Sequence, residues 1–136
     1  MKSSPRAWSV VVGLAALIAS TYVAGVRAQD AWKAAADAKN LNNPQPSTPD
    51  SVANGKKLAA KSCASCHGAT GKGDGPAAKA LKPPKPQDWA SPQVKGETDG
   101  ELFWKTTNGR GTMPPYKHLP EKDRWDLVNY IRSLQK

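Results

Sequence analysis

The clearest hydrophobic pattern in the chain lies near its C-terminus. Leu127, Tyr130, Ile131 and Leu134 recur at helical spacing, so they share one face of a helix. Pro120 suits the first turn, where a backbone N–H would have no partner in the helix. The pattern therefore predicts an amphipathic helix that begins near residue 120.

Shorter apolar clusters predict two more helices. The stretch 99–108 carries three adjacent apolar residues after the capping candidates Thr98 and Asp99, and Gly109 ends it. An earlier helix is expected to start at Asp50 or Ser51, either of which can cap it, and to run toward the first cysteine.

Glycine and proline dominate the connections between these helices. Residues 68–112 contain 13 Gly or Pro among 45 positions, a density that excludes long regular elements. No segment alternates convincingly between apolar and polar positions, as a half-buried strand would. The expected fold is all-α, with about three to five helices joined by long Gly/Pro loops.

The N-terminus carries the features of an export signal. Lys2 and Arg6 precede an apolar run from Val10 to Val26, and small or short residues suit cleavage after Ala28. Residues 1–28 are therefore predicted to be a secretory signal peptide. The 17-residue run is at the short limit for spanning a bilayer, so an uncleaved membrane anchor stays open. Either way we expect a periplasmic domain, soluble or tethered to the membrane.

Residues 29–49 separate this signal from the predicted domain at 50–136. The Ala-rich stretch 29–41 contains Trp32 and can form a short helix. Three prolines within 42–49 exclude a helix or central strand, which predicts a linker. This N-terminal extension is interpreted as a spacer from an anchor or as a docking strap for a partner protein.

Composition limits how the domain can be stabilised. Of the 52 apolar side chains, 17 lie in residues 1–28 and another 14 are alanines, which leaves 21 larger ones for a core. A small domain with so few rarely folds without a disulfide, a metal or a cofactor. The formal charge is +9, and it falls to +6 once residues 1–28 are removed. The length disfavours a barrel enzyme or a two-domain enzyme.

The strongest chemical signal is Cys63-Ala64-Ser65-Cys66-His67, which contains the only two cysteines. A C-x-x-C-H sequence is the attachment signature of c-type haem, with two thioether bonds and the histidine as an iron ligand. A thioredoxin-like motif needs a βαβ context that is not visible. Zinc would require His67 and His118 in an unusual arrangement. One haem c, covalent through Cys63 and Cys66, is therefore the predicted cofactor.

Met113 is the predicted second axial ligand of the iron, opposite His67. Without the signal segment it is the only methionine, and it lies in a stiff Gly/Pro loop between two predicted helices. A thioether is a soft, neutral ligand that favours ferrous iron and raises the reduction potential. Two alternatives stay open: Met113 as a core filler, and His118 as the axial ligand.

These motifs, in this order, resemble those of a class I cytochrome c of the small bacterial monohaem type. The similarity spans about 80 residues and implies that the first domain helix crosses the last nearly at right angles, with Gly55 at the contact. The matching features are Gly55-x-x-Leu58, Cys63 to Gly68, Gly71 to Pro76, Gly111 to Tyr116, and the final helix with Trp125, Leu127, Tyr130, Ile131 and Leu134.

The resemblance also implies groups around the haem. In the family, a proline carbonyl accepts the second N–H of the histidine ligand, and Pro76 fits that position. Later prolines stay open as alternatives. Trp89, Trp104 and Arg110 are candidates for packing on the haem or holding a propionate; a core aromatic or a solvated arginine is the alternative. The later prolines are Pro83, Pro84 and Pro86.

A His/Met iron leaves no open position for a substrate, so we predict one-electron transfer rather than catalysis. The protein would be a periplasmic carrier or the haem subunit of a respiratory or other redox complex. The alternative is a peroxidase-like haem enzyme or a gas sensor with a displaceable sixth ligand, using His118 and Arg110. No nucleic acid is expected as a partner, and membrane contact is expected only through residues 10–26 if uncleaved or through a membrane complex.

Basic residues around the motifs predict redox partners with acidic docking surfaces, although lysines also serve simply to solubilise a small protein. These lysines are Lys56, Lys57, Lys61, Lys72, Lys79, Lys82, Lys85 and Lys117.

Overall fold

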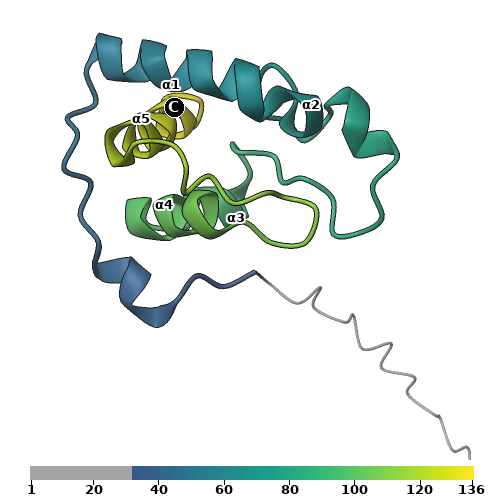
Figure 1. Ribbon diagram of the computed structural model, residues 1–136, viewed down its shortest axis with the longest axis horizontal. Helices are drawn as coiled ribbons and strands as arrows, with labels where there is room; N and C mark the ends of the chain where they lie inside the picture. Colours follow the sequence, from purple (N-terminus) through teal and green to yellow (C-terminus); the bar gives the residue numbers. More distant parts are fainter. Residues whose placement is uncertain (1–31) are drawn as a thin grey trace, which may run out of the picture. The chain divides into compact units, whose positions relative to one another are not determined.

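Helices occupy the stretches in which apolar spacing predicts them. The computed structural model describes residues 32–136, so the signal peptide or anchor predicted at 1–28 lies outside the described residues. The described range contains no β-strand, and the all-α prediction is confirmed. The elements are η1 (Ala36–Asn40), α1 (Pro49–Ser62), α2 (Ala64–His67), η2 (Pro76–Lys79), α3 (Pro92–Lys95), α4 (Asp99–Asn108) and α5 (Glu121–Ser133) (Figure 1).

The helix ends follow capping rules, with two corrections. Pro120, expected in the first turn of the last helix, instead directly precedes α5 as its N-cap residue. Thr48, not Asp50 or Ser51, caps α1: its hydroxyl accepts a hydrogen bond from the Ser51 backbone N–H, and a proline occupies the first turn. The predicted cap of α4 is confirmed, since Thr98 forms a reciprocal capping box with Glu101. Among residues 32–136, no helix combines the length and apolar character needed to cross a bilayer.

The core lies where α5 passes between α1 and α4 (Figure 1). At Gly55, α1 comes so close that a Cβ would overlap the Asp126 carbonyl and lie 2.8 Å from the Tyr130 Cβ. The expected contact at Gly55 is therefore confirmed. Trp125, Leu127 and Val128 are buried on α5, together with most of their neighbours.

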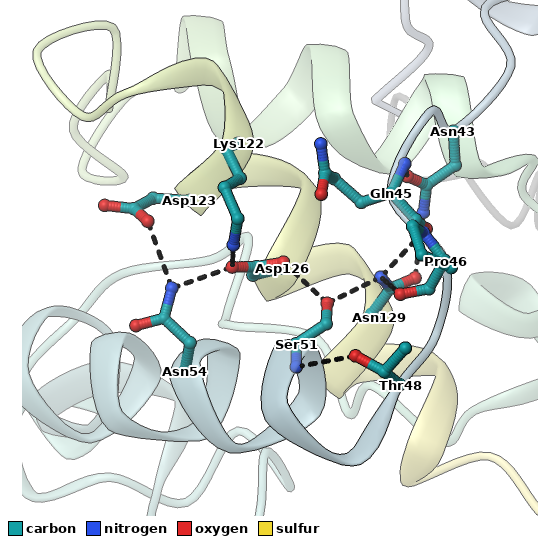
Figure 2. Close-up of polar contacts among 10 residues, drawn as sticks. All are labelled: Asn43, Gln45, Pro46, Thr48, Ser51, Asn54, Lys122, Asp123, Asp126 and Asn129. Atoms are coloured by element: carbon teal, nitrogen blue, oxygen red, sulfur yellow. Dashed lines mark hydrogen bonds and ion pairs between the residues drawn. The ribbon is translucent and has the colours of Figure 1, made fainter.

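A network of polar side chains joins α1 to α5 beside this contact (Figure 2). The Asp126 carboxylate is fully buried and accepts hydrogen bonds from Ser51, Asn54 and Lys122. Asn129, one turn further along α5, donates to the Ser51 hydroxyl at 2.8 Å. A buried carboxylate needs such donors, because a buried charge without hydrogen-bond partners is costly.

The N-terminal extension packs against the domain as far as it is described. Its Ala38, in η1, is 1 % exposed and lies against α4. Asn43 donates to the Asn129 side chain at 2.8 Å, and the Gln45 carbonyl accepts from the Asn129 amide at 3.2 Å. The short helix expected in 29–41 is a 3₁₀ helix. The proline-rich stretch forms neither helix nor strand up to Thr48, as predicted, but Pro49 opens α1. The stretch is held at the α1–α5 contact rather than acting as a free linker.

Candidate functional site

The two cysteines lie three positions apart on one tight turn. Cys63 is the residue at which α1 ends, and α2 is the single turn that follows it. The Cys63 carbonyl accepts from the backbone N–H groups of Cys66 and His67, at 3.1 and 2.8 Å. Both thiols are half-buried and not joined to each other. Burial raises the pKa of the Cys63 thiol to about 11, so it is protonated at neutral pH.

His67 ends this turn with one ring nitrogen occupied and the other available. Its Nδ1 lies 3.3 Å from the Gln87 carbonyl oxygen. Burial lowers the pKa of the imidazole, although the contact with Gln87 opposes this, so the ring is neutral at neutral pH. If Nδ1 carries the proton and donates it to Gln87, Nε2 is left with a lone pair, the form that binds a metal.

The carbonyl partner of His67 differs from the expected one, Pro76. The Gly75 backbone N–H donates to the Cys66 carbonyl, and the chain then enters η2 at Pro76. The later loop folds back instead, because the Trp89 backbone N–H donates to the Gly71 carbonyl at 2.8 Å. This return brings Gln87 to the imidazole. The sequence signal was the run of prolines that ends one residue before Gln87.

The loop that carries Met113 is tied to the cysteine motif by Tyr116. Met113 is half-buried and exchanges two backbone hydrogen bonds with Arg110, at 2.9 and 3.0 Å. Three residues later, the buried Tyr116 hydroxyl donates to the Ser62 carbonyl at 2.7 Å, directly before Cys63. His118 is exposed, with its ring centre 5.9 Å from that of Tyr116.

Two of the remaining candidates lie on or after α4, and the third, Trp89, lies before α3. Trp104 is half-buried on α4, and Arg110 is exposed in the following loop. Trp89 is 8 % exposed and stacks on the His67 ring rather than standing apart from the ligand. Sequence reasoning missed the role of Tyr116 as the anchor of the Met113 loop. The available signal was its position directly after two prolines that stiffen the chain.

The sequence matches a known family over most of the described domain. The Cytochrome c family profile matches residues 52–135, which is more than half of the chain. The chain therefore belongs to the cytochrome c family, and the resemblance to a class I cytochrome c is confirmed. Membership makes it a haem- and iron-binding protein of electron transport.

Solved structures agree with this assignment. A chain of the reducing HAO-like protein complex of Kuenenia stuttgartiensis is 30% identical with a TM-score of 0.62, and the match covers 71% of this chain and 50% of that one. The present chain thus spans about half the length of that relative. The c-type cytochrome KustC0563 is 22% identical with a TM-score of 0.51, over 60% of this chain and 98% of that one. No curated protein matches the sequence significantly.

The donor set fits the covalent haem c that the family implies. Cys63 and Cys66 offer two unpaired thiols one turn apart, and His67 offers a neutral imidazole beside them. Between residues 32 and 136, no three His, Cys, Asp or Glu side chains gather as they would around a metal ion. Two thiols one turn apart, with an imidazole directly after the second, are the set through which a c-type haem is attached.

Proposed function

We propose that this protein transfers single electrons through a haem c bound by His67 and Met113. Haem c, when bound, supplies the one-electron change between ferric and ferrous iron. Cys63 and Cys66 would hold the cofactor covalently. His67 would bind iron through Nε2 while Nδ1–H donates to the Gln87 carbonyl, which would fix the tautomer and orient the ring.

The hydrogen bond from Tyr116 to Ser62 carries the proposal for Met113. It joins the Met113 loop to the residue before Cys63, although 50 residues separate Cys63 from Met113 in the chain. A thioether held close to the motif would complete the coordination of iron and exclude water and small ligands. Pro76, Trp104 and Arg110 stay candidates for the surroundings of the haem.

The lysines around the motif support a partner protein with an acidic docking surface. All eight are exposed, and within the described residues none is paired with a carboxylate. Lys85 differs from the rest, because its ammonium donates to the Ala78 carbonyl at 2.7 Å. Unpaired positive charges speed the encounter with an acidic partner, and salt screens that effect. Association with the partner should slow as ionic strength rises.

The similarity to a chain of a multi-protein complex supports a role as a haem subunit of a redox complex, beside that of a mobile carrier. The predicted signal at residues 1–28 supports export to the periplasm. The cytochrome domain would span residues 50–136, with 29–49 as the N-terminal extension, whose described part packs on the domain.

Replacement of Met113 tests the proposed ligand set. Met113→Ala should lower the reduction potential, remove the weak long-wavelength band of the ferric iron–sulfur bond, and raise carbon monoxide binding from none to one per haem. Optical titration of the holoprotein measures all three.

His118→Ala is the matched control. It should keep the band and exclude carbon monoxide, because His118 is exposed. Loss of low-spin iron in His118→Ala with no change in Met113→Ala would overturn the assignment.

A further inference from the structure

We propose that Trp89 is a positioning residue that fixes the ring plane of His67. The inference rests on the proposed function, in which His67 binds the haem iron. The two rings stack with centroids 4.9 Å apart and an interplanar angle of 27°. A large aromatic face in this position limits rotation of the smaller imidazole, because rotation would drive the two rings into each other.

The contact with Gln87 cannot hold this plane alone. The distance from Nδ1 to the carbonyl oxygen is 3.3 Å, which is beyond the usual range for an N–H···O hydrogen bond. A single acceptor also fixes one atom of the ring and leaves the ring free to rock about that point. Trp89 supplies the second constraint, since it contacts the ring face.

Trp89 is itself held from several sides. Its backbone N–H donates to the Gly71 carbonyl at 2.8 Å, and its carbonyl accepts from the Gln135 side chain at 2.7 Å. Its ring meets that of Tyr130 edge-on, with centroids 6.2 Å apart and planes at 86°. Tyr130 lies on α5 at the contact with Gly55. The His67 ring is thus connected to the α1–α5 core through Trp89 and Tyr130.

Gly71 makes the room that this stack requires. A Cβ at that position would overlap the Trp89 ring, with the Cδ2 atom at 2.7 Å. The glycine in the loop after the haem motif therefore serves the tryptophan as well as the turn. The sequence shows the glycine, but it does not show that the Trp89 ring packs against it.

The orientation of an axial imidazole splits the iron d orbitals and so sets the g values and line width of the ferric electron paramagnetic resonance spectrum. Trp89→Leu keeps an apolar side chain but removes the flat face. We expect shifted g values, a broader line and a changed reduction potential in the holoprotein. Trp89→Phe should return the g values toward those of the wild type.

Trp125→Leu is the matched control for the loss of a buried tryptophan. Trp125 is 3 % exposed and stacks on Phe103 at 3.9 Å, not on His67. The Trp125→Leu variant should have a lower midpoint of thermal unfolding and unchanged g values. The pair Trp89→Phe and Trp125→Phe gives the same contrast with smaller changes of volume, should either leucine variant fail to fold.

The outcomes separate this inference from the proposed function. A wild-type protein without covalent low-spin haem would overturn both. Covalent haem with g values unaltered in Trp89→Leu, or altered equally in Trp125→Leu, would overturn the positioning role alone. A shift confined to the Trp89 variants, and smaller in Trp89→Phe, would support it.

Discussion

The α1–α5 contact and the haem-motif region are stabilised in different ways. At the contact, α5 is buried over residues Trp125 to Ile131, and the fully buried Asp126 has three hydrogen-bond donors. Around the motif, Cys63, Cys66, His67 and Met113 are all only half-buried. Few side-chain hydrogen bonds hold that region, and backbone turns and stacked rings hold the rest.

This difference assigns separate tasks to the two regions. The contact between α1 and α5 supplies a frame from the polypeptide alone, through two close backbones and the buried side chains of α5. The motif region leaves its thiols outside any disulfide and only one imidazole nitrogen, Nδ1, in contact with a carbonyl. In the proposed function, the thiols and the other nitrogen would bind the cofactor that completes the core. Substitutions at the contact should therefore change stability first, and substitutions around the motif should change the properties of the iron first.

Gly55→Val should have the largest effect on this frame. A side chain there would overlap the Asp126 carbonyl and push α1 away from α5. We expect the free energy of unfolding to fall by about 3 kcal/mol or more, because an overpacked contact between two backbones cannot relax locally. Denaturant titration of the holoprotein measures the loss.

Gly96→Ala is the control, since a Cβ there would find no atom closer than 3.5 Å. Its stability should change by about 0.5 kcal/mol or less. Equal losses in the two variants would show that the close approach at Gly55 is not what makes this contact sensitive.

Periodicity and capping chemistry predicted the fold well wherever one face of a helix is buried. The boundaries of α4 and the spacing on α5 followed from local sequence. The same reasoning could not reveal Asp126 and Asn129 as buried residues. Their burial depends on partners that are distant in the chain, Ser51 and Asn43, and on the extension that covers α5 from a second side.

In the candidate site, too, some residues could be predicted from local sequence and others could not. Cys63, Cys66 and His67 lie within one five-residue motif, so the sequence alone could indicate them as haem-attachment residues. Gln87 and Trp89 reach His67 only because the loop after η2 folds back onto Gly71. The family resemblance therefore predicted Pro76, and not Gln87, as the carbonyl partner of His67. Long-range loop closure has no local sequence signal comparable to a helix cap.

Asp126→Asn should cost less than Gly55→Val, about 2 kcal/mol at neutral pH. Hydrogen bonds to a charged acceptor are worth about 1.5–3 kcal/mol, and an amide would turn its own N–H toward one of the donors. Asp123→Asn is the matched control, because within residues 32–136 the Asp123 side chain accepts a single hydrogen bond, from Asn54 at 3.0 Å. The free energy of unfolding of Asp123→Asn should fall by less than half as much as that of Asp126→Asn in the same denaturant titration.

The contribution of the Asp126 carboxylate to the free energy of unfolding should also depend on pH. Burial alone would raise the pKa of this carboxyl, but bonds from Lys122, Ser51 and Asn54 outweigh it and hold the pKa below its usual range. The stabilisation is therefore present above the unfolded-state pKa and is lost as pH falls through the folded-state pKa. The gap between wild type and Asp126→Asn should narrow at pH ~3. A gap of constant size would contradict this role of the charge.

Tyr116→Phe should have the smallest effect on stability and should show it mainly at the iron. Burial raises the pKa of Tyr116 to about 12, so the phenol keeps its proton and donates to the Ser62 carbonyl at neutral pH. Loss of that bond should cost about 1 kcal/mol. It should lower the temperature at which the ferric iron–sulfur band disappears by more than it lowers the midpoint of helix unfolding.

Tyr130→Phe provides the matched control, because its hydroxyl makes only a long contact, 3.5 Å, with the Ala69 carbonyl. Removing that hydroxyl should move the two temperatures together and only slightly. If Tyr116→Phe also moved them together, the Met113 loop would unfold with the frame, and the division of tasks between the two regions would fail. If Tyr116→Phe instead lost the band at a temperature below the midpoint of helix unfolding, the contact between the Met113 loop and the haem motif would be the part of the domain that opens first.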